Sequence, residues 1–268
     1  MTDAVAHALQ PARGLASIHS KGAAMSSELK GRSALVTGSS KGIGYAIAEA
    51  MVDAGLNVVV SARNAQEVQQ AASRLSERSG GRAVGVVCDV RRPDEVQALV
   101  QRAVDEFGGL DVLVNNAGVG RFARIDEMSV EDWHQVLDTN LDGVFYCCHA
   151  AVPHLKNRGG GWIINIASLA GKNALPGGTA YNASKFGLVG FSEALMLDVR
   201  QDKIRVNYIM PGSVNTDFSG PGGHSRSDAN AWMIQPEDVA ALVMLLLRFP
   251  ENALPSRIEI RPSRPPKK

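Results

Sequence analysis

The sequence predicts an α/β fold in which one doubly wound parallel sheet of seven strands is flanked by helices on both faces. Short apolar runs rich in Val and Ile alternate with longer segments of helical periodicity, which is typical of strands joined by right-handed helical crossovers. The runs show no regular polar–apolar alternation, which indicates strands buried on both faces. A glycine cluster separates the first run from the first helical segment. With 268 residues, 45% of them hydrophobic, the chain can fill one core, and no repeat is visible.

The expected strands are the apolar runs, taken in chain order: Ala34–Thr37, Asn57–Ser61, Ala83–Cys88, Asp111–Asn115, Trp162–Ala167, Ile204–Ile209 and Arg257–Ile260. The expected helices fill the gaps between them: Gly42–Ala54, Ala65–Ser79, Pro93–Phe107, Val130–Asn157, Tyr181–Arg200 and Pro236–Arg248. Pro93 and Pro236 each stand near the start of a helix, where a proline is tolerated.

The two ends of the chain differ in composition from the rest. Residues 1–28 are rich in Ala and Ser and lack the apolar core of a secretory signal, so they predict a disordered extension. A transit peptide, or a natural start at Met25, is the alternative. Residues 263–268 form a basic, proline-containing tail that we expect to be disordered. Residues 29–262 are expected to form a single domain.

Composition excludes several kinds of partner. A net charge of +1 gives no electrostatic reason to expect binding of nucleic acid or an acidic membrane surface. The longest apolar stretch, Val239–Leu247, is too short to span a bilayer. Three cysteines and six scattered histidines form no pattern of metal ligands, so no metal is expected. The cysteines, which form no disulfide framework, suit the reducing cytoplasm.

The glycine cluster has the context of a dinucleotide-binding turn. It stands between the first strand and the first helix, with the spacing Gly-x-x-x-Gly-x-Gly. Gly38 permits the tight turn, Gly42 lets the backbone approach a pyrophosphate, and Gly44 allows close packing of helix on strand. The N-terminus of the new helix would face the anion.

Tyr181 and Lys185 form a candidate acid–base pair. On a helix, residues four apart project from one face. A free phenol has a pKa of about 10, and moving it towards 7 requires about 4 kcal/mol in favour of phenoxide. A fixed ammonium nearby is expected to supply much of that. Ser168, at the end of an expected strand, would hydrogen-bond a substrate oxygen.

With these motifs in order, the chain resembles the short-chain dehydrogenase/reductase family, in its compact single-domain form with a Rossmann sheet. The resemblance runs from about Leu29 to Pro262. It includes four further segments: Cys88-Asp89-Val90, Asn115-Asn116-Ala117-Gly118, Asn140, and Pro211-Gly212-Ser213-Val214-Asn215-Thr216. It implies hydride transfer between a nicotinamide and a carbonyl or secondary-alcohol substrate, in a homotetramer or homodimer.

The resemblance also implies the residues of the site. Tyr181 would exchange the proton, Ser168 would polarise the substrate oxygen, Lys185 would hold the nicotinamide ribose and lower the phenol pKa, and Asn140 would anchor a water. The cofactor would contact Gly38, Ser40, Lys41, Gly42, Ile43, Gly44, Arg63, Asp89, Val90, Asn116, Ala117, Gly118, Tyr181, Lys185, Pro211, Gly212, Val214 and Thr216. For three of these residues a structural role is the alternative: Asp89 caps a turn, Thr216 bonds the backbone, and Asn140 sits at a helix kink.

Charge predicts the form of the cofactor. An NAD site needs a carboxylate at the end of the second strand, but here Arg63 follows that strand and no acid occurs before Glu67. A guanidinium grips a 2′-phosphate well, and Lys41 adds a second cation. In the resembling family, basic residues at these two places mark NADP(H) users. We therefore expect NADP(H). The alternative is that Arg63 does not bind the cofactor and only begins a solvent-exposed helix.

Function is less determined than fold. The reaction is expected on a ketone, 3-oxoacyl or hydroxy-acid substrate, and the alternative is a non-catalytic NADP(H)-binding redox sensor. Residues 213–235 are expected to cover the substrate pocket. Arg121 or Arg226 would suit an acidic substrate, or each is a solvated surface charge.

Overall fold

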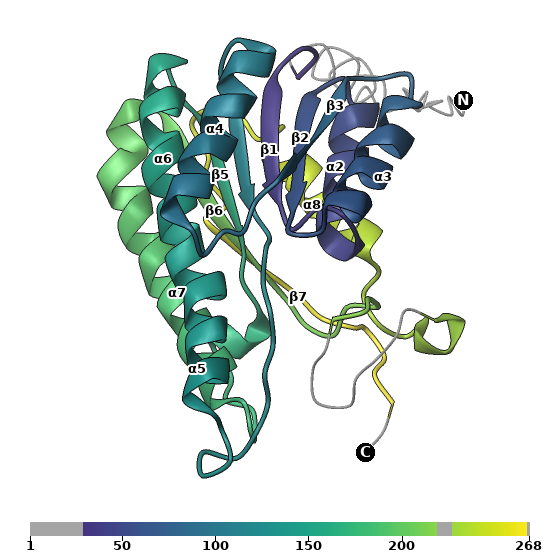
Figure 1. Cartoon of the computed structure of the whole chain (residues 1–268), viewed down its shortest axis with the longest axis vertical. Coiled ribbons are helices and arrows are strands. Elements are labelled where there is room, and N and C mark those ends of the chain that lie inside the picture. Colours follow the sequence, from purple (N-terminus) through teal and green to yellow (C-terminus); the bar gives the residue numbers. More distant parts are fainter. Residues whose placement is uncertain (1–28, 219–226, 267–268) are drawn as a thin grey trace, which may run out of the picture.

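Parallel strands form the central sheet of the computed structural model, which describes residues 29–218 and 227–266 (Figure 1). The expectation for residues 1–28, and the last two residues of the tail expected over 263–268, lie outside the described residues. Within the described ranges the sheet has seven strands in the order β3-β2-β1-β4-β5-β6-β7, which confirms the predicted fold. The strands are β1 (Ser33–Thr37), β2 (Asn57–Ala62), β3 (Ala83–Val87), β4 (Val112–Asn115), β5 (Gly161–Ile166), β6 (Ile204–Pro211) and β7 (Arg257–Ile260).

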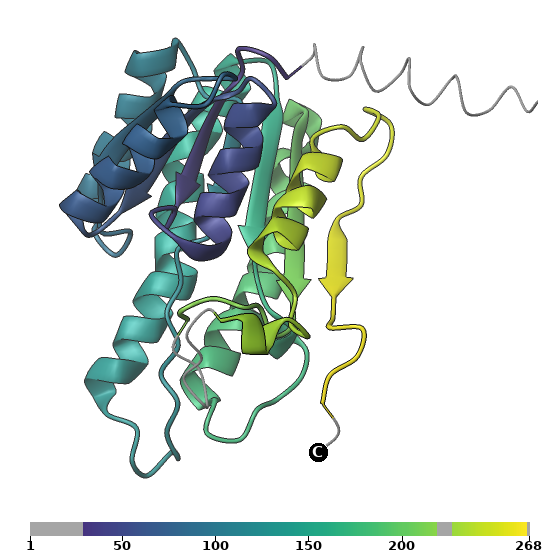
Figure 2. The same ribbon diagram turned by 90° about the vertical axis from the view of Figure 1, so that its right-hand side faces the viewer.

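Helices cover both faces of the sheet (Figures 1 and 2). Successive β1 residues show the two layers, because Ala34 and Val36 pack into one hydrophobic cluster and Leu35 into the other. The first cluster includes residues of α2 (Gly42–Asp53), α3 (Ala65–Ser76) and α8 (Pro236–Leu246). The second includes residues of α4 (Pro93–Phe107), α6 (Gly143–Asn157) and α7 (Thr179–Val199). Burial on both sides explains the continuous apolar runs.

Local sequence signals fix several helix ends. Asn64 caps α3 by accepting a hydrogen bond from the Glu67 N–H at 3.1 Å. Gln235 and Asp238 form a capping box at the start of α8. Gly108 ends α4 with a φ of 73°, a left-handed conformation that favours glycine.

The helix expected over residues 130–157 is not one continuous α-helix. It consists of α5 (Val130–Leu137), a π-helical segment (Asp138–Asp142) and α6. A π segment inserts an extra residue into the turn and is often found at functional sites. It lies where the following helix passes close to the loop after β3, since a Cβ on Gly143 would come within 2.9 Å of the Val90 side chain.

The sheet order places a crevice at the carboxyl ends of the strands. From β1 the chain builds outwards through β2 and β3, and then returns to add β4 on the other side of β1. Loops that leave β1 and β4 diverge at this switch point, where α/β proteins bind ligands. In the described ranges, no helix combines the length and apolarity required to cross a membrane.

Candidate active site

A cleft of about 870 Å³ opens at this switch point. Of the residues expected to bind cofactor or substrate, only Gly44 and Asn140 do not line it. The others do: Gly38, Ser40, Lys41, Gly42, Ile43, Arg63, Asp89, Val90, Asn116, Ala117, Gly118, Ser168, Tyr181, Lys185, Pro211, Gly212, Val214 and Thr216. The fold thus brings segments far apart in the sequence into one cavity.

The glycine turn is held tightly against the loop after β4. Gly38 has a φ of 61°, and a Cβ there would lie 2.7 Å from the Ala117 Cα. A Cβ on Gly44 would lie 2.4 Å from the Gly38 carbonyl oxygen, so Gly44 serves packing and not the cavity. Asn116 clamps the turn, because its Nδ2 donates to the carbonyl oxygens of Thr37 and Gly38 at 2.9 and 2.8 Å.

The start of α2 fits the pyrophosphate of a dinucleotide. Gly42 and Ile43 line the cleft, and no side-chain cap or first-turn acid is found at this helix start among the described residues. The free N–H groups and helix dipole at such an end favour an anion. A Cβ on Gly42, whose φ is 59°, would meet the Thr216 methyl at 3.4 Å, so glycine keeps the approach open.

Basic and acidic groups meet at the β2 end of the cleft. Arg63 and Lys41 are both exposed there. Glu67, in the first turn of α3, also lines the cleft and reaches back to the glycine turn. Its two carboxylate oxygens accept from the Ser40 hydroxyl at 3.1 Å and from the Lys41 ammonium at 3.5 Å. The sequence does not predict this contact, because Glu67 and the glycine turn are 26 and 27 residues apart along the chain.

The Asp89 carboxylate is bonded by Arg91, which lies in the same loop. Arg91 pairs with its carboxylate through the guanidinium, and the Arg91 N–H donates to Asp89 Oδ1 at 3.1 Å. These hydrogen bonds hold the pKa of Asp89 below its usual value. Asp89 lines the cleft and also caps a turn, so the expected adenine contact stays a prediction.

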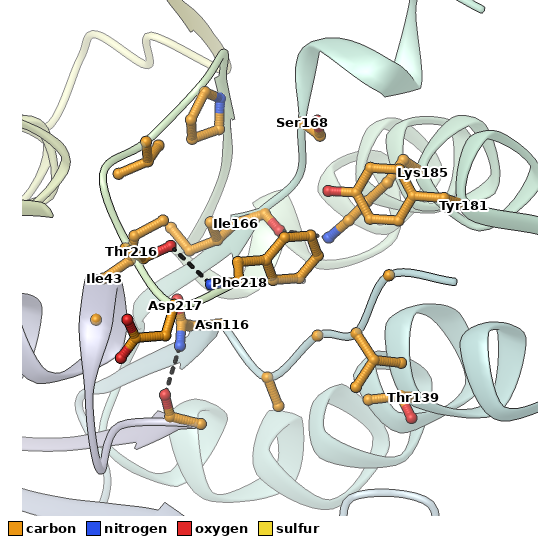
Figure 3. A pocket seen from close by; sticks show the side chains of 18 of the residues that line it. Ile43, Asn116, Thr139, Ile166, Ser168, Tyr181, Lys185, Thr216, Asp217 and Phe218 are labelled. Atoms are coloured by element: carbon orange, nitrogen blue, oxygen red, sulfur yellow. Dashed lines mark hydrogen bonds between the residues drawn. The ribbon is translucent and has the colours of Figure 1, made fainter. Parts of the chain in front are cut away.

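Ser168, Tyr181 and Lys185 gather at the other end of the cleft (Figure 3). Ser168 follows β5, and the other two project from α7. The Ser168 hydroxyl accepts a hydrogen bond from the Ala170 N–H at 3.1 Å, and it lies close enough to the Tyr181 phenol to affect its pKa. Lys185 is 5% exposed, and its ammonium donates to the Ile166 carbonyl oxygen at 3.0 Å and lies 5.9 Å from the centroid of the Tyr181 ring. The rings of Phe122 and Phe218 flank Tyr181 at 5.4 and 5.8 Å between centroids.

Burial dominates the electrostatics at this end of the cleft. Burial raises the pKa of Tyr181, and the Ser168 hydrogen bond offsets only part of that rise. Burial also lowers the pKa of Lys185 to about 8. Lys185 is not among the groups that shift the Tyr181 pKa here, so the expected lowering of that pKa by Lys185 stays a prediction. The phenol stays protonated at neutral pH.

Lys185 should weaken the fold that holds it. Burial shifts its pKa from 10.5 to about 8, which corresponds to about 3 kcal/mol of unfolding free energy lost at neutral pH. Because the folded-state pKa is the lower one, this penalty is complete below pH 8 and disappears as the pH rises through 10.5. Replacing Lys185 by Met keeps the side-chain volume but removes a hydrogen bond worth about 1 kcal/mol, so Lys185→Met should gain about 2 kcal/mol.

Urea unfolding of Lys185→Met and the unchanged chain at pH 7 and pH 9.5 tests this prediction. The gain should be present at pH 7 and clearly smaller at pH 9.5. A variant less stable than the unchanged chain at pH 7 would contradict it.

Asn140 is a buried positioning residue in the π segment. Its Nδ2 donates to the Val119 carbonyl oxygen at 2.9 Å and to the Ser184 hydroxyl at 3.0 Å, and its Oδ1 accepts from the Val119 N–H at 2.8 Å. It thus fixes the loop after β4 beside the Lys185 ammonium, since a Cβ on Gly118 would lie within 4 Å of both side chains. The expected water anchor stays a prediction.

The segment after β6 closes the remaining side of the cleft. Thr216 Oγ1 accepts from the Phe218 N–H at 3.4 Å, which is the backbone-bonding alternative for this residue, while its methyl group faces Gly42. Arg121 lines the cleft and pairs with Asp132 at 3.0 Å. Arg226 and the rest of residues 219–226, which were expected to cover the pocket, lie outside the described residues.

Comparison with known proteins agrees with this geometry. Residues 32–226 match the family described as short chain dehydrogenase. The 3-oxoacyl-acyl-carrier-protein reductase FabG of Chlamydia trachomatis is 42% identical over 233 residues, 83% of this chain and 92% of that protein. The 3beta-hydroxysteroid dehydrogenase 1 of Eggerthella lenta is 38% identical over 226 residues, 81% of this chain and 87% of that protein. The structure of a metagenomic short-chain oxidoreductase in complex with NADP is 33% identical, with a TM-score of 0.77 over 88% of this chain and 99% of that chain.

Proposed function

The chain belongs to the short-chain dehydrogenase family, and from this premise we propose that it is an NADP(H)-dependent oxidoreductase acting on a carbonyl or secondary-alcohol substrate. Its relatives carry names that range from an acyl-carrier reductase to a hydroxysteroid dehydrogenase, so the proposal covers ketones, 3-oxoacyl groups and hydroxy acids. The observation that carries it is the convergence of Ser168, Tyr181 and Lys185 in the cleft that also contains the glycine turn.

Each residue of this group has a distinct role in the proposal. The bound nicotinamide would supply or accept the hydride. Tyr181 would donate its proton to the carbonyl oxygen during reduction, a role supported by the raised pKa that keeps the phenol protonated. The Ser168 hydroxyl would hydrogen-bond the same oxygen and hold it beside the phenol. Lys185 would hold the ribose next to the nicotinamide.

The cofactor would lie along the cleft from the glycine turn to Tyr181. Gly38, Gly42 and the start of α2 would hold the pyrophosphate, while Lys41 and Arg63 would hold the 2′-phosphate. The solved relative in complex with NADP supports this choice of cofactor.

Purified protein incubated with NADPH and a panel of ketones and 3-oxoacyl thioesters tests the proposed function. We expect the absorbance of NADPH to fall with at least one class of carbonyl compound. The competing proposal is a redox sensor that binds NADP(H) without turnover. Tight NADPH binding with no consumption across the panel would favour the sensor.

We also propose that the chain forms a homotetramer or homodimer in the cytoplasm. Phe145 on α6 and Phe186 and Leu197 on α7 are 48%, 48% and 58% exposed, which is unusual for large apolar side chains on neighbouring helices. The buried free thiols of Cys88, Cys147 and Cys148 suit a reducing compartment. Light scattering at micromolar concentration should give a mass of at least two chains, and a monomer would contradict the proposal.

A further inference from the structure

Glu67 places a carboxylate where the donors of the cofactor site point. Its oxygens accept from the Ser40 hydroxyl and the Lys41 ammonium, one each. These are two of the groups at the β2 end of the cleft, where Arg63 also lies. The Glu67 carboxylate occupies donors that could also bind the 2′-phosphate of the cofactor. The carboxylate and the phosphate would therefore compete for the same hydrogen bonds.

The backbone of Glu67 is held by the start of its own helix. Its N–H is bonded by the Asn64 cap, and its charge lies in the first turn of α3, where the helix dipole stabilises an acid. The side chain is partly exposed, as is that of Lys41, so their ion pair adds little to stability. The ion pair with Lys41 thus contributes little to the fold, and the carboxylate lies beside the cations expected to bind the cofactor.

We propose that Glu67 sets the balance between NADPH and NADH. Its carboxylate weakens binding of the 2′-phosphate by repulsion and by occupying Ser40 and Lys41. It also offers an acceptor for the 2′-hydroxyl of the adenosine ribose, which is free in NADH and phosphorylated in NADPH, as a carboxylate does in NAD sites. The chain then uses both cofactors, with a preference for NADPH that is smaller than Lys41 and Arg63 alone would give. This inference rests on the proposed function.

The test is direct binding of each cofactor, by calorimetry, to the full chain and to Glu67→Gln. Removing one charge a few ångströms from the phosphate should lower the dissociation constant for NADPH by about fivefold at low salt. The constant for NADH should rise by about twofold to threefold, because an amide oxygen is a weaker acceptor than a carboxylate. Glu67→Ala should change the NADPH constant in the same direction.

Glu77→Gln is the matched control. It removes the same charge at the other end of α3, and it should leave both constants unchanged. An NADPH constant that is unchanged or raised in Glu67→Gln would overturn the inference, since it would mean that Glu67 positions Lys41 and does not compete for it. If the unchanged chain binds neither dinucleotide, the proposed function fails and this inference fails with it.

Discussion

Tyr181→Phe is expected to retain less than a few per cent of the turnover of the unchanged enzyme while it still binds NADPH. A positioned general acid contributes about 10²–10⁴ in rate. The substitution removes the proton donor and leaves the ring between Phe122 and Phe218. Steady-state rates with the best substrate of the carbonyl panel, together with the dissociation constant for NADPH, give both quantities.

Tyr146→Phe is the control for the loss of a phenol hydroxyl. Tyr146 lies on α6, packs against the sheet core and is not among the residues that line the cleft. Its substitution should leave turnover unchanged. If Tyr181→Phe kept more than a few per cent of the activity, Tyr181 would not be the acid.

The second large effect is expected from the cations at the β2 end of the cleft. Lys41→Ala combined with Arg63→Ala should raise the KM for NADPH at least tenfold and change the KM for NADH little, because only NADPH carries the 2′-phosphate. A tenfold rise in KM corresponds to a loss of about 1.4 kcal/mol of binding free energy, which two charge-assisted contacts can supply.

Arg102→Ala combined with Lys156→Ala removes the same total charge from exposed positions on α4 and α6. This pair should leave the KM values for both cofactors as they are. Equal losses for NADPH and NADH in the Lys41 and Arg63 variant would refute the assignment of these residues to the 2′-phosphate.

The sequence was sufficient for the fold because the strands are continuous apolar runs and the glycine turn falls between a strand and a helix. It failed at residues 138–142, since a single inserted residue leaves the apolar pattern of a long helix almost unchanged. Asn140 was expected inside that helix, and its position beside Lys185 depends on the π segment.

Side-chain environments were predicted less well. The Tyr181 pKa depends on burial, whereas sequence spacing shows only that Lys185 is near. Sequence shows Glu67 as the first acid after Arg63, but not that the first turn of α3 brings its carboxylate back to Ser40. Asp89 meets its partner only two residues later, in Arg91. Such pairings follow from the path of the loops, which apolar periodicity does not describe.

The most direct test of the account is to follow the hydride itself. The protein is given NADPH carrying deuterium at both C4 positions of the nicotinamide, with a ketone that supports turnover, and the product is analysed by mass spectrometry. We expect an alcohol with one deuterium on the carbinol carbon, and no such product from Tyr181→Phe. An alcohol without deuterium, or a cleft that binds NADPH and reduces no carbonyl compound, would contradict it.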